Sequence, residues 1–91
     1  MHGEHKTRGG KLVVADLEVR EGLLADVKIS GDFFLEPPEA LSRITEAVEG
    51  APADLEEDAL ASRVREGLGA GVEMVGFSPE SVAAAVRKAL S

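Results

Sequence analysis

The sequence predicts an α+β fold, in which an antiparallel β-hairpin sheet of two to three strands packs against about three helices. Apolar residues alternate between positions 11 and 33, and this is the period of a β-strand. From position 38 onward they recur every three or four residues, which is the period of a helix. The change falls in the segment Ile29–Pro38, which holds two of the three Phe and two of the four Pro residues. Sheet and helix are therefore expected to meet there.

The length allows one small domain. The chain has 91 residues and an apolar share of 44 %. That is enough for one modest core, with little left over for a deep substrate pocket. We assign residues 11–91 to a single folded domain. Residues 1–10 are polar, carry several basic side chains and end in a glycine pair, so we predict a flexible N-terminal arm there.

The composition argues against several classes of function. The formal net charge of −7 disfavours a nucleic-acid partner, because phosphate binding needs a basic face. The sequence has no run of about 18 apolar residues and no signal segment, so we expect no membrane association and a cytoplasmic location. The chain has no cysteine for a disulfide, thiol chemistry or a metal. His2 and His5 stand on either side of Glu4, but a third ligand at a metal-binding spacing is missing, and we predict no metal site.

The predicted hairpin is defined by its apolar face. The first strand, residues 11–20, places four apolar side chains on one face: Val13, Ala15, Leu17 and Val19. The turn is at Glu21-Gly22. A plain two-residue turn would set Arg20 opposite Leu23 and bring an apolar face beside a polar one. We therefore predict a bulged turn, with Gly22 at positive φ, that pairs Val19 with Leu23.

Two adjacent aromatic residues follow the second strand. In extended chain, Phe33 and Phe34 point to opposite sides. The alternation places Phe33 with Val27 and Ile29, so we predict that Phe33 anchors the core. Phe34 is then left on the other face, where it needs a cover. We expect Phe34 to lie against a helix of this chain or against a partner, or else to stay exposed.

The second half of the chain is predicted to be mainly helical. The predicted helices span 38–49, 54–68 and 79 to about 90. Gly50 is the expected C-terminal stop of the first helix, and Asp54 with Glu57 is the expected N-terminal capping box of the second. Val72–Val75 is predicted to be a short strand, with an extended linker as the alternative. Ser78 is the expected N-cap of the third helix, because Pro at the next position suits the first turn.

Two motifs resemble a known family. Gly10-Lys11-Leu12-Val13 opens the hairpin, and Val27-Lys28-Ile29-Ser30-Gly31-Asp32-Phe33-Phe34, with Pro37 following, closes it. With the order of hairpin, Gly-Asp-Phe-Phe segment and helices, they resemble the accessory domain of lipoate–protein ligases over most of the chain. The end, Gly76-Phe77-Ser78-Pro79-Glu80, is similar to that family's closing capped helix. The chain opens with Met1 and holds only this domain, so it resembles the separate small subunit of some archaea and bacteria.

The resemblance implies an indirect role. In that family the large domain binds lipoate and ATP, with Mg²⁺, makes lipoyl-AMP and transfers the lipoyl group to a Lys of an acceptor domain. The small domain supports activation and changes its placement during the cycle. No catalytic residue of the large domain has a counterpart in this sequence. The resemblance thus implies a non-catalytic subunit that binds no cofactor itself and forms a heterodimer with the large ligase subunit.

We expect the contact with the large subunit at or beside the segment that carries the resemblance. The candidate interface residues are Lys11, Gly31, Asp32, Phe33 and Phe34. From the residues alone, no active site is apparent: there is no Gly-rich phosphate loop, and both His residues lie in the predicted arm, away from every Ser.

Three other functions are conceivable for a chain of this size and composition. A lipoylated acceptor needs a Lys at a hairpin tip, whereas the predicted tip is Glu21-Gly22. An acyl carrier protein is all-helical and carries its modifiable Ser in Asp-Ser-Leu, a tripeptide that this sequence lacks. A docking scaffold resembling the iron–sulfur assembly adaptors remains as the alternative, in a purely docking role, because without cysteine the chain has no thiolate for a cluster.

Overall fold

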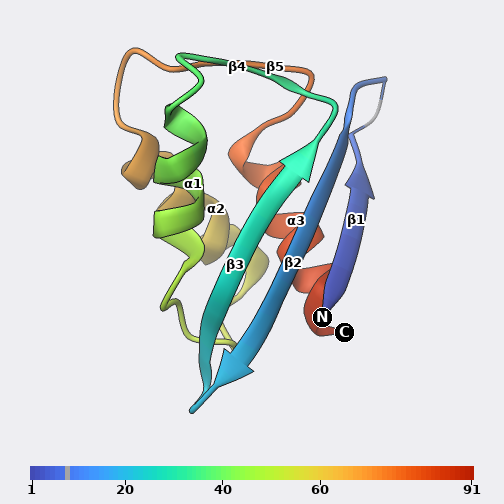
Figure 1. Cartoon of the computed structure of the whole chain (residues 1–91), viewed down its shortest axis with the longest axis vertical. Helices are drawn as coiled ribbons and strands as arrows, with labels where there is room; N and C mark the ends of the chain where they lie inside the picture. Colours follow the sequence, from blue (N-terminus) through green and yellow to red (C-terminus); the bar gives the residue numbers. More distant parts are fainter. Residues whose placement is uncertain (8) are drawn as a thin grey trace.

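A three-stranded antiparallel sheet forms one layer of the molecule, and the helices pack behind it (Figure 1). The structure is a computed structural model that describes residues 1–7 and 9–91. Its elements are β1 (His2–Lys6), β2 (Leu12–Arg20), β3 (Leu23–Gly31), β4 (Phe34–Glu36), α1 (Ala40–Val48), α2 (Glu57–Leu68), β5 (Glu73–Val75) and α3 (Pro79–Leu90). The predicted α+β class is confirmed. The sheet has the order β1-β2-β3, and β4 pairs with β5 in a separate two-stranded ribbon at one end of the molecule.

The N-terminal segment differs from the prediction. Residues His2–Lys6 form strand β1, which pairs with β2 so that Gly3 lies opposite Ala15 and His5 opposite Val13. Gly3 is buried, and β1 lies along α3. The expectation of a flexible arm over residues 1–10 is therefore wrong for this strand, and Arg8 lies outside the described residues. Backbone pairing and packing against a helix hold β1, and neither is visible in its polar composition.

The hairpin turn between β2 and β3 is a plain two-residue turn and not the predicted bulged turn. Arg20 lies opposite Leu23 and Val19 opposite Leu24, so the predicted register is wrong. Gly22 does have a positive φ of 78°, and Glu21 also has a positive φ, of 53°. Two positive φ values in succession are typical of the type I′ turn, whose twist matches that of the flanking strands.

A β-bulge in the middle of the hairpin corrects the faces. The ladder shifts register between Asp16 and Glu18, where β3 carries one residue more than β2. Asp26, at this point of β3, has a positive φ of 52°. The bulge changes the parity of the buried face, which holds Leu24 before it and Val27 after it. After the bulge, Val27 and Ile29 therefore lie on the same buried face of the sheet as the apolar residues of β2.

The loop after α1 explains why α2 begins later than predicted. Backbone bonds join Leu24 N–H to Ala51 O (2.8 Å) and Ala53 N–H to Gly22 O (2.8 Å), so this loop covers the start of β3. The loop takes up the chain as far as Glu56, and α2 begins at Glu57 rather than at Asp54. The predicted capping box of Asp54 and Glu57 is wrong, because Glu57 is the first helical residue.

The other helix boundaries follow the sequence signals more closely. The helix α1 begins at Ala40, two residues later than predicted, and Gly50 follows it with a φ of 80°. At the start of α3 the Ser78 Oγ accepts a hydrogen bond from the Ser81 N–H (3.1 Å), and the Ser81 Oγ accepts one from the Ser78 N–H (3.2 Å). The predicted Ser78 cap and the short strand near Val75 are both confirmed.

The core lies between the sheet and the helices. α3 packs against β1 and β2, α1 packs against β3, and α2 packs on both of these helices. The largest fully buried side chains are Leu24, Ile44, Leu60, Val13, Val48, Val64, Val82 and Val86. The sheet and all three helices contribute to this set. Within the described ranges, none of the helices has the length and apolarity needed to cross a membrane.

Candidate partner-binding surface

The segment after β3 leaves the sheet in a turn that is tied to the start of β2. The Asp32 carboxylate accepts a hydrogen bond from the Leu12 N–H (2.7 Å), and the Asp32 N–H donates to the Leu12 carbonyl (3.3 Å). At Gly31 an added Cβ would lie 2.1 Å from the Leu12 oxygen, so the two backbones approach too closely for any side chain there. Gly31 and Asp32 thereby determine the direction in which the following aromatic residues leave the sheet.

Phe33 turns inward and meets a second aromatic ring. Its ring stacks on that of Phe77, with centroids 3.9 Å apart and an angle of 17° between the planes. Phe77 is 6 % exposed, whereas Phe33 is half-buried and packs against the edge of the core. Phe33 thus lies on the predicted side, but the more deeply buried aromatic residue is Phe77. The burial of Phe77 was not predicted, because Phe77 stands alone in a short segment without periodicity.

Phe34 points away from the core. It is 60 % exposed, and its cross-strand partner in the β4–β5 ribbon is Val75, which is 46 % exposed. Leu35, the next residue, points inward and is buried. A helix of this chain was one of the expected covers for Phe34, and the exposure of the ring shows that this expectation is wrong. Val75 was not among the predicted candidates, since its position opposite Phe34 depends on the pairing of two very short strands.

The backbone of Lys11 is hydrogen-bonded at the end of the molecule that carries the β4–β5 ribbon. Its N–H donates to the Gly76 carbonyl (3.0 Å), and its carbonyl accepts from the Thr7 N–H (3.0 Å). The side chain of Lys11 lies so close to Gly76 that an added Cβ at Gly76 would meet its Cγ at 2.4 Å. All five predicted candidates, from Lys11 to Phe34, therefore gather where β2 begins and β3 ends.

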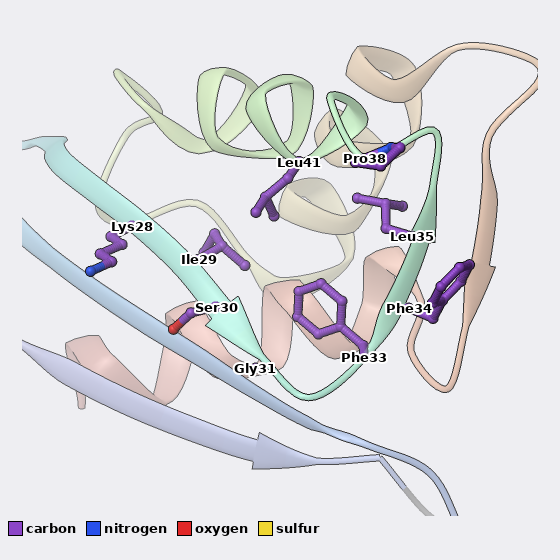
Figure 2. A pocket seen from close by; sticks show the side chains of 9 residues that line it. All are labelled: Lys28, Ile29, Ser30, Gly31, Phe33, Phe34, Leu35, Pro38 and Leu41. Atoms are coloured by element: carbon purple, nitrogen blue, oxygen red, sulfur yellow. The ribbon is translucent and has the colours of Figure 1, made fainter.

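A groove opens beside these residues, between β3 and α1. It has a volume of about 470 Å³ and is lined by Lys28, Ile29, Ser30, Gly31, Phe33, Phe34, Leu35, Pro38 and Leu41. Figure 2 shows Ile29, Phe33, Leu35 and Leu41 around its interior, with Phe34 directed to the other side, toward β5. A second hollow of about 580 Å³ shares the Ile29 and Leu41 walls and continues along α1.

The chemistry of the groove is suited to binding. Lys28 is its one charged lining residue and Ser30 its one hydroxyl, and the other lining residues are apolar or Gly. An apolar lining with a few polar groups is typical of pockets that bind small molecules. Over residues 1–7 and 9–91, no three His, Asp or Glu side chains are grouped so that they could hold a metal ion.

Comparison with known proteins gives one solved structure of the same fold. It belongs to an archaeal lipoylation system, described as a bi-partite lipoate protein ligase and its E2 lipoyl domain from Thermoplasma acidophilum. The superposition has a TM-score of 0.69, covers 100 % of this chain and 93 % of the other, and the two are 23 % identical in sequence. This likeness shows a shared fold. No protein-family model matches the chain. No curated protein matches it either.

Proposed function

We propose that this chain is the non-catalytic accessory subunit of a two-part lipoate–protein ligase. The observation that carries the proposal is the fold shared, over the full chain, with a component of a bi-partite lipoate protein ligase system. The family resemblance of the Gly31–Phe34 segment supports it independently, since that resemblance was drawn from the residues alone. In this proposal the chain acts in the cytoplasm and forms a heterodimer with the large subunit.

The chemistry belongs to the partner in this proposal. Lipoate, ATP and Mg²⁺ bind to the large subunit, which makes lipoyl-AMP and lipoylates acceptor domains. This chain contributes a surface: the exposed Phe34, the apolar groove between β3 and α1, and the tightly tied turn at Gly31 and Asp32. A rigid surface of this kind favours the active arrangement of a partner without ordering costs of its own.

A role as the lipoyl acceptor fits the chain less well. A lipoyl acceptor would need a Lys at a hairpin tip, whereas the β2–β3 tip consists of Glu21 and Gly22. Lys11 lies in the connection between β1 and β2, and its side chain packs against Gly76. Lys28 lies within strand β3. The accessory role needs no modified residue.

Reconstitution tests the proposal. The large subunit from the same organism is incubated with lipoate, ATP, Mg²⁺ and an acceptor domain, with and without this chain, and lipoylation is followed by the mass of the acceptor. We expect efficient lipoylation only when both chains are present, and no lipoate-dependent pyrophosphate release from this chain alone. Equal lipoylation by the large subunit with and without this chain would contradict the accessory role.

A pair of variants connects the activity to the surface. Phe34→Ala should keep the fold, because the ring is 60 % exposed, while it weakens binding to the large subunit and slows lipoyl-AMP formation. Leu23→Ala is the matched control, since Leu23 is also exposed, at 45 %, but lies at the opposite end of β3. Equal effects of both variants would remove Phe34 from the interface.

A further inference from the structure

The outer face of the β4–β5 ribbon combines exposed apolar side chains with a pair of like charges. Cross-strand partners share a face of a sheet, so Phe34 stands beside Val75 and Glu36 beside Glu73. All four residues are exposed, whereas Leu35, which points to the other face, is buried. We call these four residues the ribbon face. It therefore presents one large apolar pair and one pair of carboxylates to solvent.

The carboxylates of Glu36 and Glu73 face each other across the ribbon. Like charges directly opposite in an antiparallel ladder destabilise the pairing. Neither Glu36 nor Glu73 forms an ion pair with any of the residues that the structure describes. Beside them, Phe34 and Val75 expose apolar surface. A single neighbour with an apolar patch next to a cation would relieve both features.

The ribbon is held in place on its inner side. Leu35 is 8 % exposed, and the Lys11 N–H donates to the carbonyl of Gly76, directly after β5. The buried Phe77 follows at once. The ribbon face is therefore presented on anchored backbone, which lowers the ordering cost of a contact.

We propose that the ribbon face is the surface on which the large ligase subunit docks. In this proposal the large subunit presents an apolar pocket that receives Phe34 and Val75. An Arg or Lys at the edge of this pocket places its charge between Glu36 and Glu73. Charge complementarity carries this choice, because the chain has a net charge of −7 and draws basic surfaces toward it, while the carboxylate pair specifies where a cation lies. An Arg guanidinium suits the position, since its donors can bind two carboxylates at once. The identity of the partner rests on the proposed function.

The test is a binding titration of this chain against the large subunit by calorimetry, at low and at high salt. The double variant Glu36→Gln, Glu73→Gln removes both charges and keeps the shapes. We expect it to bind about tenfold more weakly and to lose most of the salt dependence of the wild type. Its melting temperature should equal or exceed that of the wild type, because the repulsion within the ribbon is gone. A merely structural role would not combine equal stability with weaker binding.

The matched control is Asp58→Asn, Glu66→Gln on helix α2, which changes the net charge by the same amount at exposed positions. It should bind within about twofold of the wild type, since screened charges far from a contact act weakly. If the wild type binds and the ribbon variant binds as tightly as this control, the docking surface lies elsewhere and only the proposed function stands. If the wild-type chain does not bind the large subunit at all, both the docking surface and the proposed function are wrong.

Discussion

Gly3→Ala is the substitution whose expected effect on Tm differs most between a flexible N-terminal arm and the packed strand β1. The structure buries Gly3 against helix α3, where an added Cβ would lie 2.3 Å from the Ala89 nitrogen and 2.4 Å from the Ala85 oxygen. Both neighbours are backbone atoms, so no side chain can rotate away. Ordinary contacts between such atoms begin about 1 Å farther out. The strand must therefore move away from α3 and strain its pairing with β2.

The expected magnitude follows from this forced shift. Overpacking of a close-packed site costs about 1–3 kcal/mol. With an unfolding entropy of about 2.1 cal/mol/K per residue, each kcal/mol lowers the melting temperature of a chain of this length by roughly 5 °C. We thus expect Gly3→Ala to lower Tm by about 5–15 °C. A flexible arm predicts no change in Tm, because residue 3 would then be equally free in the folded and the unfolded state.

Thermal unfolding followed by circular dichroism measures the shift. Lys6→Ala is the control on the same strand, since Lys6 is exposed and its side chain has little packing to lose. Amide hydrogen exchange gives a second readout, because β1 amides that bond to β2 should lose protection in Gly3→Ala. A Tm within about 2 °C of the wild type, with unchanged exchange in β1, would refute the packing of β1 on α3.

Three further predictions concern the turn, the aromatic stack and the N-terminal histidine. Gly22→Val should destabilise by on the order of 1 kcal/mol or more in urea unfolding, because Gly22 has a φ of 78° that a branched residue resists; an unchanged midpoint would show that the turn relaxes freely. Phe77→Ala should cost about 3–5 kcal/mol in the same assay, the usual loss for a buried Phe, and a cost below about 1 kcal/mol would argue against the stacked core position. Hydrogen bonds to Glu4 and then to Asp16 raise the pKa of His2 above 6.5, so its contribution to stability is fully present below pH 6.5 and is lost as the pH rises through the folded-state pKa. His2→Asn should therefore lie closest to the wild type in Tm at high pH, and a constant Tm difference from pH 5 to 9 would contradict this pairing.

Several features of the protein were determined by the sequence itself. The alternation in residues 11–33 predicts the hairpin, and the helical period after position 38 predicts three helices. The prediction that α3 starts at Ser78-Pro79 is correct, because an N-cap depends only on residues three positions apart in the sequence. The same holds for the opposite directions of Phe33 and Phe34, which follow from their adjacency in extended chain. These are local properties, set by neighbours along the chain.

The tertiary structure decided the features that depend on distant neighbours. His2–Lys6 is a strand because β2 supplies its hydrogen bonds and α3 its packing. No periodicity within those residues indicates the pairing or the packing. The register of the hairpin depends on a bulge at Asp26, whereas the apolar pattern of the two strands predicted the bulge at the turn. Likewise, Val75 and Glu73 join Phe34 and Glu36 in one surface only because two strands of three residues pair across about forty positions of sequence. Long-range pairing of such short segments leaves almost no periodic signal, and so the ribbon face belongs to the fold rather than to any stretch of the sequence.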